Sequence, residues 1–280
     1  MTAPASRTAP IAAPPHRTRR RYASWRPKAA LVAVVIALVV SQAVVFVFQL
    51  VAGGEGGTVD GVTAISLVLA DAVMIGIVLV FARRGAERLS AATLGIRRTR
   101  FGPALGWMLA IYFGVVALEG LWALLLAALG ADGGVSRHDA GSPGAPSTAT
   151  ALAIFFAIAV AAPIGEEIAF RGYLFPALTR WRGPWTGAIL TGLLFGAAHF
   201  LVYPVVFLPA LTFFGFGACL LFWFTGSLLP SICLHAINNA IAAGVLLGGS
   251  WQVPLGVLGA VAAVLLLLTP FARERAPQTA

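Results

Sequence analysis

The chain contains the stretch Pro163-Ile-Gly-Glu166-Glu167-Ile-Ala-Phe-Arg171-Gly172, with three charges inside an apolar run over residues 149–178. Ionisable groups at bilayer depth cost at least about 2.5–3.5 kcal/mol each on insertion scales, so they persist where they are paired, face a protein interior or do chemistry. Residues four apart share a helix face, which predicts an ion pair between Glu167 and Arg171. Glu166 lies about 100° around the helix from Glu167 and does not share that partner equally. The carboxylate of Glu166 is therefore the first candidate for function.

The composition around this stretch is that of a membrane protein. Of the 280 residues, 59% are hydrophobic and only 10% are charged, more apolar surface than a soluble domain of this length can bury. Cys219 and Cys233 lie in apolar segments and form neither a disulfide framework nor a Cys-x-x-Cys signature. The net charge of +9 comes mainly from basic residues that flank apolar segments. This placement is typical of membrane topology and argues against nucleic-acid binding.

The apolar segments predict an all-α fold, a polytopic bundle of about eight transmembrane helices. Each is close to the roughly 20 residues that cross a bilayer. The predicted spans are about 29–51, 61–82, 103–130, 149–178, 185–202, 205–224, 227–247 and 252–271. We predict three regions: a disordered basic cytoplasmic tail over 1–28, an integral membrane domain over 29–271, and a cytoplasmic tail over 272–280. The long apolar run at 29–51 favours an anchor over a cleaved signal peptide.

The connecting loops predict the orientation of these helices. Basic residues follow the second, fourth and eighth spans, on the same side as the Arg-rich N-terminal tail. The opposite side carries four acidic residues and one basic residue: Glu55, Asp60, Asp132, Asp139 and Arg137. By the positive-inside rule, both termini are expected in the cytoplasm.

Two further polar sites lie in later spans. His199 ends the small, apolar run Leu193–Ala198, while His235 and Asn239 are one helical turn apart on one face. At about 1.5 Å rise per residue, Glu166 lies roughly 18 Å, His235 roughly 12 Å and His199 roughly 22 Å from the cytoplasmic ends of their helices. With boundary errors of several residues, these depths allow the three side chains to meet near the middle of the bilayer. Such a group resembles an acid/base site that activates water.

Glu166-Glu167-x-x-x-Arg171, Phe195-x-x-x-His199 and His235-x-x-x-Asn239, in this order on successive helices, resemble the three motifs of the CPBP family. That family contains CAAX prenyl endopeptidases and bacteriocin-processing or Abi-type membrane proteins, and the resemblance covers about 149–247. It implies an intramembrane glutamic endopeptidase in which Glu166 activates water, His199 assists, and His235 with Asn239 stabilises the oxyanion. It implies no metal or other cofactor.

Several other polar residues have structural interpretations. Glu167 and Arg171 are expected to orient the helix rather than react. Asp71 and Glu119 are intramembrane acids outside the motifs, for which bundle hydrogen bonding or cavity lining is favoured over proton handling. Small residues around Gly192, Gly196, Gly215 and Gly217 indicate close helix packing: these positions are expected at helix–helix contacts rather than in ligand loops.

Three alternatives to the endopeptidase remain. Glu166, His199 and His235 form a plausible zinc ligand set, which makes a zinc-dependent variant the metalloenzyme alternative. A non-catalytic scaffold or bacteriocin-immunity protein retains the motifs for folding, and a transporter uses the polar cavity as a proton path. The expected partners are a peptide or small membrane-protein substrate and the lipid bilayer, with no nucleic acid. The expected location is the cell membrane as a multi-pass protein, and the Ala/Gly/Arg-rich composition favours a bacterial plasma membrane.

Overall fold

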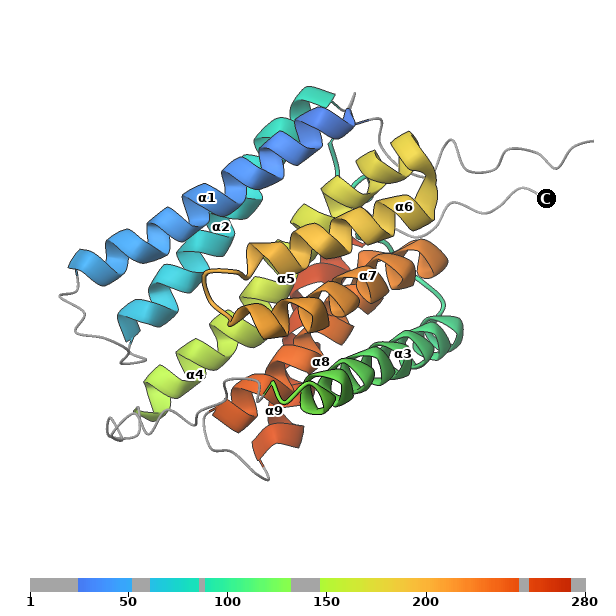
Figure 1. The fold of residues 1–280 in the computed structure, drawn as a ribbon. Coiled ribbons are helices and arrows are strands. Elements are labelled where there is room, and N and C mark those ends of the chain that lie inside the picture. The colour runs from blue at the N-terminus through green and yellow to red at the C-terminus, as the bar shows by residue number, and fades with distance from the viewer. Residues whose placement is uncertain (1–24, 52–60, 86–88, 132–146, 247–251, 273–280) are drawn as a thin grey trace, which may run out of the picture.

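The computed structural model describes residues 25–51, 61–85, 89–131, 147–246 and 252–272, and every long element among them is a helix. The order is α1 (Pro27–Val51), α2 (Gly61–Gly85), α3 (Phe101–Ala128), α4 (Thr148–Phe156), η1 (Ala157–Ala161), α5 (Ala162–Glu167), η2 (Ile168–Leu174), α6 (Phe175–Ala198), η3 (Val205–Phe207), α7 (Leu208–Thr225), α8 (Leu228–Leu246), α9 (Gln252–Leu268) and η4 (Thr269–Phe271). Figure 1 shows them as one bundle in which α1 lies along α2, and α7 lies between α6 and α3. The all-α membrane bundle predicted from hydropathy is confirmed.

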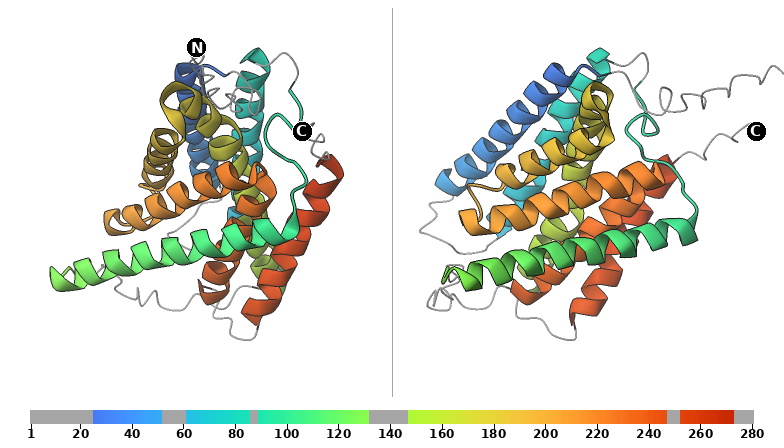
Figure 2. Two further views of the ribbon diagram at one scale, coloured as in Figure 1. Left: turned by 90° about the vertical axis from the view of Figure 1, so that its right-hand side faces the viewer. Right: turned by 45° about the vertical axis from the view of Figure 1, so that its right-hand side comes forward.

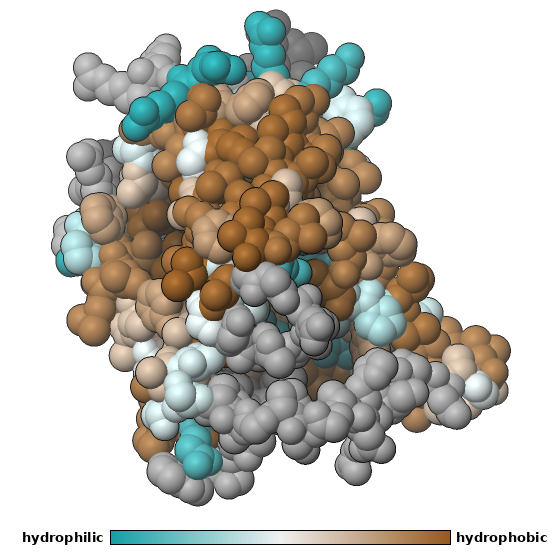
Figure 3. Space-filling model, turned by 90° about the vertical axis from the view of Figure 1, so that its left-hand side faces the viewer, coloured by the Kyte–Doolittle hydropathy of each residue, from teal (hydrophilic) through white to brown (hydrophobic). Residues whose placement is uncertain are grey.

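The surface of the bundle is suited to lipid. Six described helical stretches are long and apolar enough to cross a membrane, and the apolar helix at Leu228–Gly244 is somewhat shorter. Large apolar side chains are exposed along α1, α3 and α9, whereas hydrophilic residues gather along the upper edge of the face drawn in Figure 3. The protein is therefore a multi-pass membrane protein, and the count of eight crossings stays a prediction.

Gly183 divides the longest of these stretches, Thr148–Ala198, into two helices. Its φ of 84° and ψ of 170° interrupt α6, and this backbone region is essentially confined to glycine. Pro184 follows, which has no N–H to continue the preceding helix. In Figure 2 the chain turns back at this point, so that the fourth and fifth predicted segments run in opposite directions. The second of them ends at Ala198, a few residues earlier than predicted.

The first helix begins inside the segment predicted as a tail. Pro27 starts α1, and Trp25 before it is only 2% exposed. The indole Nε1 of Trp25 donates a hydrogen bond to the carbonyl oxygen of Ala82 at 3.1 Å, and its ring packs edge-on against Tyr173. Residues 1–24 and 273–280, which hold most of the two predicted tails, lie outside the described residues.

Loops that were predicted on one side of the membrane meet in the bundle. The backbone N–H of Leu228, at the start of α8, donates to the carbonyl oxygen of Gly95 in the connection between α2 and α3. Ser227 donates to the carbonyl oxygen of Arg97 in the same connection. Both contacts join segments that the positive-inside pattern assigned to the cytoplasm. The orientation itself remains a prediction.

Candidate active site

Two wide helical turns frame the glutamates. The π-helical segments η1 and η2 flank α5, a six-residue helix that ends at Glu167. Pro163 lies in the first turn of α5, and because it lacks an N–H it cannot donate to the carbonyl oxygen five residues before it, that of Ile158. The side-chain amide of Asn239 donates to this oxygen instead, at 3.0 Å. Asn239 on α8 thereby fixes the segment that carries Glu166.

The predicted ion pair between Glu167 and Arg171 forms, with 2.8 Å between Nη1 and Oε1 and both side chains fully buried. Arg171 also donates from Nη2 to the carbonyl oxygen of Gly215 on α7 at 2.9 Å. A buried ion pair requires such additional hydrogen bonds to offset its desolvation. The pair therefore ties α5 and η2 to α7.

His235 lies between the two glutamates. Its Nδ1 is 3.0 Å from Oε1 of Glu167, and its Nε2 is 3.8 Å from Oε2 of Glu166. A carboxylate accepts hydrogen bonds, so Nδ1 carries the proton that it shares with Glu167. The carboxyl group of Glu166 remains 19% exposed, whereas Glu167 is fully buried. The two adjacent glutamates thus have different surroundings, as the sequence suggested.

Phe195, the aromatic residue of the second motif, packs against all three motifs. The guanidinium carbon of Arg171 lies 4.5 Å from the centre of its ring. The ring centres of His199 and His235 lie 4.9 Å and 5.8 Å from it. A cation over an aromatic face is stabilised by the ring's quadrupole. Phe195 therefore holds the charged and imidazole groups at fixed positions relative to one another.

A cavity of about 270 Å³ opens beside these residues. Its polar lining comes from five segments of the chain: Ser41, Gln42, Asp71, Glu166, His199, Tyr203 and Asn239. His235 is not part of the lining, but its Nε2 lies 3.8 Å from Oε2 of Glu166, which is. The structure thus brings Glu166, His199 and Asn239 to one space, with His235 directly behind Glu166.

The hydrogen bonds of His199 define its tautomer. Its Nδ1 lies 2.8 Å from the carbonyl oxygen of Phe195, and a carbonyl oxygen only accepts, so Nδ1 carries the proton. In the neutral ring, Nε2 is then an acceptor. His199 ends α6 with φ of −93° and ψ of 3°, outside the helical region. This break turns the chain into the connection that contains Tyr203.

Four of the polar lining residues were not assigned to the site from sequence: Ser41, Gln42, Asp71 and Tyr203. Asp71 was considered only as an intramembrane acid, and Ser41 and Gln42 are adjacent polar residues in a largely apolar span. Tyr203 follows His199 by four residues, a spacing that places two side chains on one side of a helical turn. Burial raises the pKa of the Tyr203 phenol above its usual value, and the negative charge of Glu166 raises it further. The phenol therefore keeps its proton at neutral pH and is a hydrogen-bond donor.

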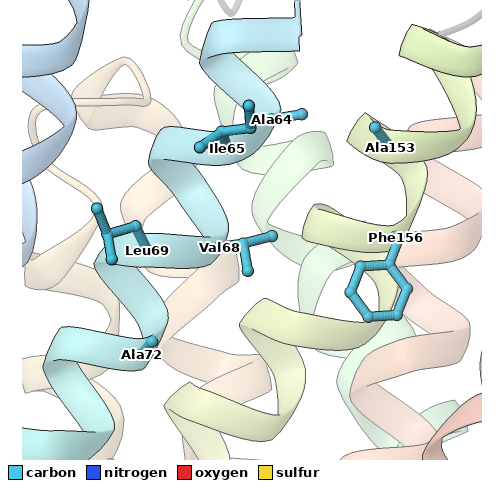
Figure 4. Close-up of a pocket in the computed structure, with 7 residues that line it drawn as sticks. All are labelled: Ala64, Ile65, Val68, Leu69, Ala72, Ala153 and Phe156. Atoms are coloured by element: carbon cyan, nitrogen blue, oxygen red, sulfur yellow. The ribbon is translucent and has the colours of Figure 1, made fainter.

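An apolar groove of about 510 Å³ lies between α2 and α4 next to this cavity. In Figure 4, Val68 on α2 and Phe156 on α4 point toward each other. They are Ala64, Ile65, Val68, Leu69, Ala72, Ala153 and Phe156. Asp71 on α2 and Ala157 after α4, each next in sequence to a groove residue, line the polar cavity.

Zinc stays an alternative prediction, although the described residues show no ready-made ligand group. Among them, no three His, Cys, Asp or Glu side chains are grouped closely enough to hold a metal ion, and zinc sites use three or four protein ligands. Glu119 on α3, the other intramembrane acid noted in the sequence, does not line the polar cavity.

Comparison with known proteins gives one match. Residues 148–241 match the family model described as "Rce1-like: Type II CAAX prenyl endopeptidase Rce1-like". No curated protein and no solved structure matches the chain. The matched segment begins with α4 and contains all three motifs. The match of residues 148–241 to the Rce1-like model of type II CAAX prenyl endopeptidases confirms the family resemblance that the three motifs had predicted.

Proposed function

We propose that this protein is an intramembrane endopeptidase that hydrolyses a peptide bond of a membrane-associated substrate with water activated by Glu166. The main support for this proposal is the set of side chains that line the polar cavity. A partly exposed carboxylate, an imidazole with a free acceptor nitrogen and a carboxamide line one space, in the segment that matches a peptidase family.

Glu166 is the general base of the proposed reaction. It takes a proton from water as the water oxygen attacks the scissile carbonyl carbon, and general-base catalysis of this kind contributes about 10²–10⁴-fold. His199 assists by accepting a hydrogen bond from the same water at Nε2. Both residues reach the cavity, whereas Glu167 is held by Arg171 and His235 and is not available as a base.

Asn239 and His235 stabilise the oxyanion in this proposal. The amide nitrogen of Asn239 has two N–H groups, and Ile158 occupies one of them. For His235 to donate from Nε2 while Nδ1 donates to Glu167, its ring must carry both protons. The carboxyl groups of Glu167 and Glu166 lie 3.0 Å and 3.8 Å from the two ring nitrogens of His235.

The substrate is proposed to approach from the bilayer. The groove between α2 and α4 is lined only by apolar side chains, so an apolar segment of a membrane-bound peptide can lie there. The same two segments of the chain also supply residues to the polar cavity. The scissile peptide must be unwound at the site, because the amides of an intact helix are held in internal hydrogen bonds. Whether the apolar part is a prenyl group or a peptide segment is left to the experiment.

The experiment compares peptides released from membranes that contain the wild-type protein or Glu166→Gln at matched expression. Glu119→Gln, an intramembrane acid remote from the cavity lining, is the control. Peptides released with wild type and Glu119→Gln, but not with Glu166→Gln, support the proposal and identify the substrate. Identical peptide profiles for all three proteins overturn it in favour of the scaffold.

A chelator arm tests the zinc alternative on the same membranes. The proposal expects peptide release to continue after treatment with EDTA. Release that stops with EDTA and returns with added zinc would replace the glutamate mechanism with the metal-dependent one.

A further inference from the structure

Asp71 on α2 adds a second carboxyl group to the cavity, from outside the segment that matches the family model. A carboxyl group this deep in a bundle is costly unless it is paired, neutral or functional. Its side chain is half-buried and lines the same space as Glu166, His199 and Asn239.

Gly165 brings α2 close to the catalytic segment. A Cβ atom at Gly165 would lie 3.4 Å from both Cβ and Oδ1 of Asp71, and 3.1 Å from the methyl group of Met74. The residue directly before Glu166 is therefore in contact with the Asp71 side chain, and a larger residue there would push the two helices apart. Asp71 can therefore lie near Glu166 because α2 packs closely on α5 at Gly165.

The surroundings favour one proton shared between these two carboxyl groups. None of the described residues that line the cavity is a lysine or arginine, and Arg171 is occupied by Glu167 and Gly215. Two neighbouring carboxylates without a cation between them do not both ionise readily. Glu166 has the imidazole of His235 at 3.8 Å, which holds its carboxyl group in place as the base and leaves Asp71 as the acid of the pair.

Peptide hydrolysis needs such a proton, because an amine leaves only after its nitrogen is protonated. His199 presents an acceptor at Nε2, since its proton is on Nδ1. Asn239 is not an acid. Asp71 and Glu166 thus provide an acid and a base that face the same space, the arrangement that assigns acid and base roles in other carboxylate enzymes.

We propose that Asp71 is the general acid of the proposed peptidase reaction and protonates the leaving amine. Glu166 takes one proton from water, and the hydroxide oxygen bonds to the carbonyl carbon while the C=O π electrons move to oxygen. As the tetrahedral anion collapses, the C–N bond breaks, its electron pair stays on nitrogen, and the nitrogen takes the proton of Asp71. The proton on Glu166 then moves to Asp71, which restores both groups. The inference rests on the proposed function.

The test uses the peptide identified from wild-type membranes and an analogue in which the scissile amide is an ester. An ester expels an alkoxide, a much better leaving group than an amine anion, so it depends far less on the acid. For Asp71→Asn we expect amide cleavage to fall about 10²-fold or more, and ester cleavage by less than about tenfold. Asp71→Glu should recover part of the amide activity, and Glu119→Gln should match the wild type on both substrates.

A second readout does not depend on turnover. In the infrared spectrum at neutral pH, the wild type should show the C=O stretch of a protonated carboxylic acid that is missing from Asp71→Asn. Ester cleavage by Asp71→Asn also reports that the variant is folded.

The outcomes separate the two proposals. If Glu166→Gln cleaves both substrates like the wild type, the peptidase proposal itself fails. If Glu166→Gln is inactive but Asp71→Asn retains the wild-type ratio of amide to ester cleavage, or shows no loss of the infrared band, Glu166 acts as both base and acid and the assignment of Asp71 is overturned.

Discussion

At the scale of single residues, the site depends on how three buried polar side chains share their hydrogen bonds. Glu167 accepts from both Arg171 and His235 through the same oxygen, Oε1. The other oxygen, Oε2, is buried without a hydrogen-bond partner among the described residues, as is Nε of Arg171. Unpartnered buried polar atoms raise the energy of the folded state. Substitution of any one of Glu167, Arg171 and His235 should therefore remove a hydrogen bond from at least one of the others and lower the stability of the protein.

Arg171→Met should destabilise the protein by about 3–5 kcal/mol, since it leaves the carboxylate of Glu167 buried without its cation. The double variant Glu167→Gln/Arg171→Met should recover part of this loss because no unpaired charge remains. Thermal unfolding in detergent measures the difference, with Arg182→Met, at an exposed arginine, as the control. A single variant as stable as the wild type would contradict the buried ion pair.

Asn238 and Asn239 are adjacent on α8, so a substitution of Asn238 serves as the control for the same substitution of Asn239, the residue of the third motif. Asn239→Ala should lower stability by about 1–3 kcal/mol, because the carbonyl oxygen of Ile158 loses its side-chain donor. It should also slow peptide cleavage, since the same amide faces the cavity. Asn238→Ala, whose side chain is not part of the cavity lining, should leave both properties near the wild type. Equal effects of the two variants would argue against a specific role for Asn239.

At the scale of elements, close packing of α6 on α7 positions the site. A Cβ atom at Gly192 would lie 2.8 Å from the backbone nitrogen of Phe216, and one at Gly215 would lie 3.0 Å from Cα of Gly192. Gly196 is similarly close to Thr212 on α7. The close packing predicted for these small residues is confirmed. Small residues at helix interfaces let backbones approach in membranes, and here the approach brings the carbonyl oxygen of Gly215 to Arg171.

Gly192→Leu should separate α6 from α7, lower the unfolding temperature and reduce cleavage, because Phe195 and His199 follow on the displaced helix. Gly114→Leu on α3 is the control, since a Cβ atom there meets nothing within 4 Å. Unfolding temperature and cleavage rate are measured for both variants. If Gly192→Leu behaves like Gly114→Leu, α6 is not fixed by this contact.

At the scale of the whole molecule, both termini are predicted in the cytoplasm. Cysteines introduced at Leu129, at the end of α3, and at Arg182, beside the turn at Gly183, lie at exposed positions. In intact cells, an impermeant thiol reagent should label Leu129→Cys, whereas Arg182→Cys should react only after permeabilisation. The native cysteines, Cys219 and Cys233, are buried and give little background. The reverse labelling pattern would invert the predicted topology.

The helices and three motifs were predictable because bilayer thickness imposes long apolar runs and because charges within them are rare. The Glu167–Arg171 pair followed from helical spacing alone. The position of His235 between two glutamates and the entry of Asp71 into the cavity were not predictable, since both depend on contacts between helices distant in sequence. The wide turn before α5 occurs where Pro163 removes a donor and Asn239 supplies another, a combination visible only in three dimensions.

The most direct test of the account uses purified protein reconstituted in liposomes with the peptide identified from wild-type membranes. If Glu166 activates water, the wild type and Glu119→Gln should cleave the peptide, and Glu166→Gln should cleave it at a rate at least about 10²-fold lower. Correctly folded Glu166→Gln that cleaves at the wild-type rate would contradict the claim that Glu166 activates water in this site.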